Sequence, residues 1–334
     1  MKKELGLFVL LIVLCLTVVG VEIGQQLHDG STWGELTKPR FLTAINFSNL
    51  ATRIGLYGVF SLGLGLVIIA GGIDLSVGSM VALIGVILSI ALTEWKWGWV
   101  ASGMLVVALP MALGWAHGKL VTQAKVQPFI VTLCGLMIYR SLARYIADDG
   151  TKGFGDAEGF KGFANLANGK MLGVPSPFVI LILLSVILWF VLHRSVYGRY
   201  LFAVGRNEDA TRFSGINTRL VITASYILLG ALTGLAGILW AFYTNSISPS
   251  NHGNSFELYG IAAAVLGGCS LRGGEGSIVG ILIGTALLQV LENLVNLLGI
   301  KSSLTLAVMG TVVLVGVLAD QFFQNRAVKK MVRR

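Results

Sequence analysis

The sequence predicts an all-α fold, a polytopic bundle of about ten transmembrane helices with both termini in the cytoplasm. Of the 334 residues, 55% are hydrophobic and 12% are charged, and the mean hydropathy is +0.80. The charged share is about half that of soluble domains. This composition excludes an ordinary soluble enzyme and a disordered chain. Lipid must therefore be the solvent for most of the molecule.

Ten apolar windows are long enough, or nearly long enough, to cross a bilayer. Their approximate limits are 5–23, 49–71, 75–93, 98–116, 127–146, 176–192, 220–241, 257–270, 277–297 and 303–319. The first window follows a basic start and lacks a small-residue cleavage site, so we interpret it as an uncleaved helix rather than a signal peptide. The eighth is short and interrupted by glycines, which predicts a broken or re-entrant helix.

The basic residues favour one orientation of these spans. With both termini inside, the cytoplasmic segments hold 15 of the 25 basic residues and 6 of the 16 acidic ones. The whole net charge of +9 then lies on the side where the positive-inside bias places it. We therefore expect a single transmembrane domain over residues 1–334. Its outer loop at 147–175 would dock a partner or be flexible, and its cytoplasmic loop spans 193–219.

The segment Gly71–Ser79 (GGIDLSVGS) joins the second and third windows. Two glycines end one helix, and Asp74 is placed to accept hydrogen bonds from the first N–H groups of the next. A lone carboxylate at a membrane helix end is costly unless it is paired, so a direct substrate or proton role is the alternative. We favour the capping role.

A polar stripe runs along the ninth window. Its members fall at i, i+4, i+7, i+8 and i+11, on one face of a helix: Thr285, Gln289, Glu292, Asn293 and Asn296. Amides that both donate and accept suit the hydroxyls of a neutral polyol, which predicts a substrate path along this face. Hydrogen bonding between neighbouring helices explains the same pattern equally well.

The cytoplasmic loop contains a short helix with its own capping residues. Asn207 is a good N-cap, Glu208 lies in the first turn, and Gly215 follows as a C-terminal stop. Ala210 and Phe213 lie three residues apart on one face, and their exposure would be unusual without a partner.

Other patterns predict packing and surface contacts. Glycines at four-residue spacing, at 230 and 234 and at 276, 280 and 284, allow close helix packing. Arg144 and Asp148 have the spacing of a surface ion pair. Neither Gly-Lys pair is followed by Ser or Thr, so the chain has no phosphate-binding loop and is not expected to be an enzyme. Its cysteines and histidines show no metal-site spacing.

Three long segments, in this order, carry a family resemblance: Gly71–Ser79, Ala203–Ile216 (AVGRNEDATRFSGI) and Ile261–Gly280 (IAAAVLGGCSLRGGEGSIVG). In them the chain resembles the membrane permeases of bacterial ABC sugar importers of the ribose, xylose, galactose and arabinose type. The resemblance covers about residues 41–320. One departure is Glu292, where close ribose-type relatives carry Asn-rich residues.

The resemblance implies a multi-pass protein of the bacterial inner membrane. It implies three partners: a second permease subunit, usually an identical copy, a cytoplasmic ABC ATPase, and a periplasmic sugar-binding protein. ATP and Mg would be bound by the ATPase, with no cofactor in this chain. The family's coupling helix, which docks on the ATPase, matches the segment 207–215 and its residues Asn207, Glu208, Ala210, Phe213 and Gly215.

Two alternatives remain open from the sequence. One is a proton-coupled secondary transporter, with Asp74 or Glu292 as the proton site. The other is an ABC permease for a non-sugar small solute such as an amino acid, because the broader group includes branched-chain amino-acid permeases.

Overall fold

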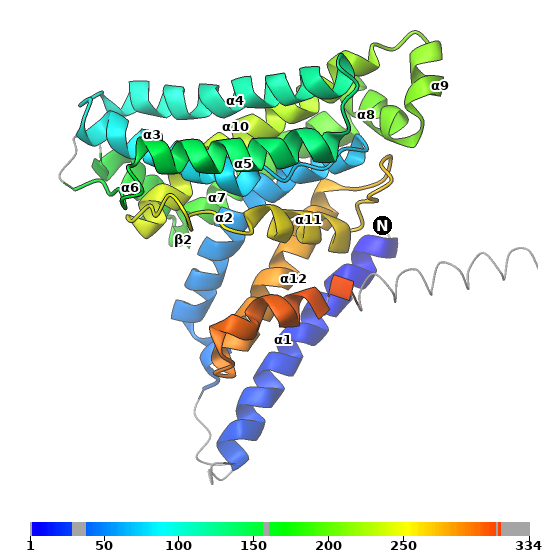
Figure 1. The fold of residues 1–334 in the computed structure, drawn as a ribbon. Coiled ribbons are helices and arrows are strands. Elements are labelled where there is room, and N and C mark those ends of the chain that lie inside the picture. The colour runs from blue at the N-terminus through cyan, green and yellow to red at the C-terminus, as the bar shows by residue number, and fades with distance from the viewer. Residues whose placement is uncertain (1, 29–37, 156–159, 312, 315–334) are drawn as a thin grey trace, which may run out of the picture.

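The computed structural model describes residues 2–28, 38–155, 160–311 and 313–314 (Figure 1). Seven of its helices are long and apolar enough to cross a membrane. They are α1 (Lys2–His28), α2 (Ala44–Ile69), α4 (Trp99–Thr122), α5 (Pro128–Ile146), α7 (Ser176–His193), α10 (Thr218–Thr244) and α12 (Ile278–Leu297). The shorter elements are η1 (Arg40–Leu42), α3 (Val77–Thr93), α6 (Phe160–Asn168), β1 (Lys170–Met171), β2 (Val174–Pro175), α8 (Val196–Arg206), α9 (Glu208–Phe213), α11 (Phe256–Leu266) and η2 (Ser302–Leu304).

These helices confirm the all-α prediction and coincide with the first nine apolar windows. Helix α11 has 11 residues. At 1.5 Å per residue it extends about 16 Å, roughly half the hydrocarbon thickness. This length agrees with the broken helix expected there. The tenth window begins with η2 and a helical segment at 305–311, and most of its remainder lies outside the described residues. The number of spans and the side of each terminus stay predictions.

Helix α2 is the centre of the bundle. Every residue from Gly55 to Ile69 is buried, and the helix packs against α7, α10, α11 and α12. A helix that is apolar all round is stable only inside a bundle or in lipid, which explains why this segment is surrounded by others.

The glycine pairs mark close helix contacts. Helices α4 and α10 run side by side (Figure 1). A Cβ atom built at Gly230 would lie 2.2 Å from the carbonyl oxygen of Pro110. One at Gly284 would lie 2.0 Å from the carbonyl oxygen of Ala263 in α11. The expected close packing is thus confirmed, although Gly276 precedes α12 and only Gly280 and Gly284 belong to the helix.

Two groups of short elements lie at opposite ends of the bundle. Helices α8 and α9 form one end, and α6 lies at the other (Figure 1). The loop containing α6 is attached to α10, because Phe154 stacks on Phe242 at 4.0 Å and Phe163 contacts the same ring at 5.3 Å. These aromatic contacts anchor the predicted outer loop to the bundle.

The expected pair between Arg144 and Asp148 is wrong. Arg144 Nε lies 2.6 Å from Asp149 Oδ1 instead. Helix α5 has already ended, and both aspartates have positive φ angles of 52° and 54°. This left-handed turn brings the second carboxylate back to the arginine.

Candidate functional site

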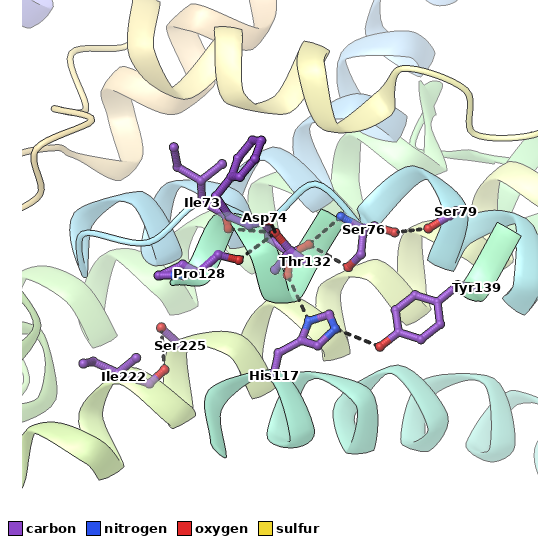
Figure 2. A network of polar contacts seen from close by, with 11 residues as sticks. Ile73, Asp74, Ser76, Ser79, His117, Pro128, Thr132, Tyr139, Ile222 and Ser225 are labelled. Atoms are coloured by element: carbon purple, nitrogen blue, oxygen red, sulfur yellow. Dashed lines mark hydrogen bonds and ion pairs between the residues drawn. The ribbon is translucent and has the colours of Figure 1, made fainter. Parts of the chain in front are cut away.

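Asp74 lies in a buried polar junction that joins the α2–α3 connection to α4 and α5 (Figure 2). Its Oδ1 accepts hydrogen bonds from the backbone N–H and the hydroxyl of Ser76, both at 2.7 Å. Its Oδ2 lies 3.4 Å from His117 Nδ1. The other ring nitrogen of His117 lies 2.8 Å from the Tyr139 hydroxyl. All four side chains are buried; Ser76 and His117 contact the carboxylate directly, and Tyr139 contacts it only through His117.

The local backbone explains how Asp74 reaches this position. Gly71, with φ of 88°, turns the chain out of α2. Ser76 is the N-cap of α3, and Asp74 bonds to this residue rather than to the first N–H groups inside the helix. The predicted cap is therefore corrected to a turn that precedes the helix, a usual geometry for an aspartate bonding two residues ahead. The hydroxyl of Thr132 in α5 donates to the carbonyl of Ile73 at 3.1 Å and fixes the same connection.

A cavity of about 450 Å³ adjoins this junction on the side of α9. Its walls come from the end of α2, the α4–α5 connection, α9 and the start of α10. Its polar lining includes Lys125, Gln127, Glu208, Asp209, Arg212 and Arg219. Tyr226 also lines it, and its buried hydroxyl has no hydrogen-bond partner among the described residues. The volume is within the usual range for a small-molecule pocket.

Helix α9 has the bounds and caps that the sequence predicts. The Asn207 side chain accepts a hydrogen bond from the N–H of Ala210 at 2.9 Å. Gly215 has φ of 84° and lets the chain turn after the helix. Thr211 is buried against the rest of the protein, and Glu208 accepts a hydrogen bond from Thr218 at 3.1 Å. The opposite face is open.

That open face carries the two residues expected to dock on a partner. The Phe213 side chain is 83% exposed, and Ala210 is exposed as well. A phenylalanine so accessible in the loop that carries much of the basic charge is typical of a contact surface. The structure thus presents an attached, capped helix with a free apolar face.

The polar stripe of α12 contacts α2 over part of its length. Asn293 and Asn46 exchange two amide hydrogen bonds, at 2.8 and 3.2 Å. Glu292 forms an ion pair with Arg53. Both contacts join α12 to α2, as the interhelical alternative requires.

The remaining stripe residues have different surroundings. Thr285 bonds back to the carbonyl of Ile281, so its polarity is satisfied within its own helix. Gln289 is 1% exposed, and its Oε1 has no partner among the described residues. Asn296 is exposed. The stripe therefore runs from a buried amide to an accessible one.

Sequence reasoning missed the residues that pair with the predicted ones. Arg53 was detectable as the single charge inside the second apolar window. His117 and Tyr139 carry no such signal, because both sit singly in apolar helices and meet Asp74 only through the fold. Among the described residues, no group of three or more His, Cys, Asp or Glu side chains is placed to hold a metal ion.

The family and the relatives that match this chain are all described as transport permeases. A family described as branched-chain amino acid transport system / permease component matches residues 46–318. The ribose import permease protein of Bacillus subtilis is 38% identical to this chain, with 86% of this chain and 88% of the relative covered. The ribose import permease protein of Escherichia coli K12 is also 38% identical, covering 84% and 87%. The L-arabinose transport system permease protein of the same strain is 33% identical, covering 86% of each. No solved structure matches the chain.

Proposed function

The chain belongs to the branched-chain amino acid transport system / permease component family, and from this premise we propose that it is the membrane-spanning permease subunit of an ATP-driven ABC importer for a monosaccharide. The observation that carries the proposal is the agreement among its relatives. Two ribose import permeases and an arabinose permease each align with more than four-fifths of the chain. These relatives support a pentose-like sugar over the amino acids that the family description names.

The chain is a multi-pass protein of the bacterial inner membrane. We propose that a separate protein supplies the energy for transport. It carries no phosphate-binding loop, so a separate cytoplasmic ABC ATPase would bind ATP and Mg. Helix α9 supports this arrangement, because it is rigidly capped and attached on one side while Ala210 and Phe213 face outward. A periplasmic sugar-binding protein would supply the substrate on the opposite side, and a second copy of the chain would complete the permease.

The mechanism follows from these parts. Closure of the ATPase around ATP would move α9, which is bonded through Glu208 to Thr218 at the start of α10. Helix α10 packs closely along α4, and α4 carries His117, which touches Asp74. A movement of α9 would thereby be transmitted through α10 and α4 to the α2–α3 connection, which adjoins the cavity lined by α9. We place the substrate path along Gln289, Glu292, Asn293 and Asn296, with Asp74 near its inner end.

The test is co-expression with an ABC ATPase and a sugar-binding protein from the same genome. We expect the three proteins to co-purify and the complex to hydrolyse ATP faster when the binding protein is loaded with D-ribose. Ala210→Arg places a hydrated cation on the exposed face of α9 without touching a membrane helix, and should abolish both ATPase co-purification and uptake. Wild-type behaviour of this variant would show that α9 is not the coupling element.

The alternatives predict different outcomes in the same assay. A proton-coupled transporter would accumulate solute without any ATPase, and would lose activity when a protonophore collapses the proton gradient. An amino-acid permease would respond to a binding protein loaded with a branched-chain amino acid and not to one loaded with sugar.

A further inference from the structure

Arg53 places a cation in α2, the most buried of the seven long helices. It is the tenth residue of α2, and its guanidinium pairs with Glu292 of α12. Charged side chains within transmembrane helices are costly and usually mark a substrate or ion pathway. The two opposite charges cancel, so the pair leaves a neutral environment with strong donors on one side and strong acceptors on the other.

Aromatic rings surround the position one turn further along α2. Tyr57 lies four residues after Arg53, on the same face of the helix. Its ring centroid is 5.1 Å from Trp240 of α10, 5.3 Å from Phe256 and 5.1 Å from Tyr259, both of α11. Because Arg53 and Tyr57 share one face of α2, the ion pair with Glu292 lies one helical turn from this group of rings. The ion pair and the rings therefore form one cluster drawn from four helices.

Two polar atoms of this cluster are buried without a hydrogen-bond partner among the described residues. They are Nε1 of Trp240 and Oε2 of Glu292. Trp240 is 8% exposed, so its N–H does not find water on the protein surface. Buried polar groups almost always have partners, and an unpaired donor and an unpaired acceptor in the same cluster indicate that another molecule satisfies them at a different stage of transport.

The cluster has an accessible side and a buried side. The Arg53 side chain is 39% exposed and Tyr243, whose ring lies 5.7 Å from that of Trp240, is 38% exposed. Tyr57 and Trp240 are each 8% exposed. Arg53 lies toward the start of α2, while Trp240 and Glu292 lie near the ends of α10 and α12, so the expected topology puts all of them in the outer half of the bundle. A solute released outside would meet this cluster early.

We propose that Arg53, Glu292, Tyr57, Trp240 and Tyr259 form the monosaccharide site of the permease in its outer half. The proposal rests on the proposed function and gives it a location. Arg53 donates to hydroxyl oxygens of the sugar, and Oε2 of Glu292 accepts from a hydroxyl. Nε1 of Trp240 donates to another oxygen, and the Tyr57 and Trp240 rings pack on the C–H face of the sugar. The rings touch one another in the described conformation. Binding therefore needs a displacement of α11, the short helix that carries Tyr259.

The competing explanation is that the ion pair only holds α2 against α12. Trp240→Phe tests the site, because it keeps an aromatic ring, although a smaller one, at this position and leaves the ion pair intact while removing the unpaired N–H. Trp95→Phe is the matched control, since Trp95 is half-exposed on the loop after α3. Uptake of D-ribose and of L-arabinose is measured in proteoliposomes that contain the complete importer. We expect Trp240→Phe to lower uptake about threefold to tenfold, the effect of one lost hydrogen bond, and to change the ratio between the two sugars.

A second experiment tests the site by exchanging the two charges. Arg53→Glu combined with Glu292→Arg restores an ion pair between the helices but reverses its donors and acceptors. The site predicts that this double variant assembles while its uptake stays low. Recovery of wild-type uptake by the double variant, or unchanged uptake and sugar ratio in Trp240→Phe, would overturn the site. Absence of sugar uptake by the wild-type complex would instead contradict the proposed function, so the two failures are distinguishable.

Discussion

The amide pair between Asn46 and Asn293 allows a quantitative test of how α12 is held against α2. Each side chain donates to the other, at distances of 3.2 and 2.8 Å. Replacing Asn293 by leucine removes both bonds and leaves the Asn46 amide facing an apolar side chain. Replacing both residues by leucine removes the unsatisfied groups together. The losses of unfolding free energy in the two single variants should therefore sum to more than the loss in the double variant.

The magnitude follows from the number of bonds lost. One intramolecular hydrogen bond contributes about 0.5–1.5 kcal/mol net, so either single replacement should cost about 1–3 kcal/mol of unfolding free energy. In Asn293→Leu, Asn46 keeps its bond to the carbonyl of Phe41 at 3.1 Å, which places the cost of this variant toward the lower end, whereas Asn46→Leu loses that third bond as well and should cost more. Between membrane helices such bonds average about 0.6 kcal/mol each, so we expect a coupling energy of about 1 kcal/mol.

The assay is unfolding of the purified permease in mixed micelles by increasing SDS, for the wild type, both single variants and the double variant. Coupling of the expected sign and size would confirm the pair. Effects of the two replacements that add within about 0.3 kcal/mol would show that the residues do not interact, and would refute this reasoning. Asn296→Leu is a suitable control, because Asn296 is exposed on the same helix.

Three further predictions concern packing, pH and topology. Gly230→Leu should prevent folding or purification, because even a Cβ atom would lie 2.2 Å from the carbonyl oxygen of Pro110, whereas Gly162→Ala, with nothing within 4 Å, should be tolerated. Burial, reinforced by a nearby arginine, lowers the pKa of His252 from 6.5 to about 4, so the folded connection 245–255 stays neutral where the unfolded chain gains a proton. The free energy of opening this connection, measured by hydrogen exchange, should be highest above pH 6.5 and lower by about 1 kcal/mol at pH 5.5. His252→Gln should remove this pH dependence. In a cysteine-free background, Leu172→Cys should be labelled only from outside and Phe213→Cys only from the cytoplasm; labelling of both from one side would contradict the predicted orientation.

The sequence predicts best the features that local chemistry determines. Helix α9 begins and ends where Asn207 and Gly215 indicate, since a cap and a left-handed turn act within one turn of helix. The face of α12 follows from helical periodicity alone. The short α11 was expected because glycines interrupt the apolar run at 267 and 268.

Contacts between distant segments are what the sequence could not supply. Glu292 was recognised as a lipid-level carboxylate, but its partner Arg53 lies 239 residues earlier in the chain. His117 looked like an isolated histidine, and only the packing of α4 brings its ring to Asp74. The pair of Arg144 was misassigned because helical spacing does not hold past the end of α5, where two successive residues adopt positive φ.

The most direct test of the proposed function is uptake of radiolabelled D-ribose into proteoliposomes that contain the permease, its ATPase and its binding protein. ATP and Mg are enclosed on the ATPase side, and the loaded binding protein is added on the other. We predict that ribose accumulates only with ATP, is insensitive to a protonophore, and is lost with Ala210→Arg. Accumulation that needs no ATPase and stops when the proton gradient collapses would contradict the assignment of this chain as the permease of an ATP-driven sugar importer.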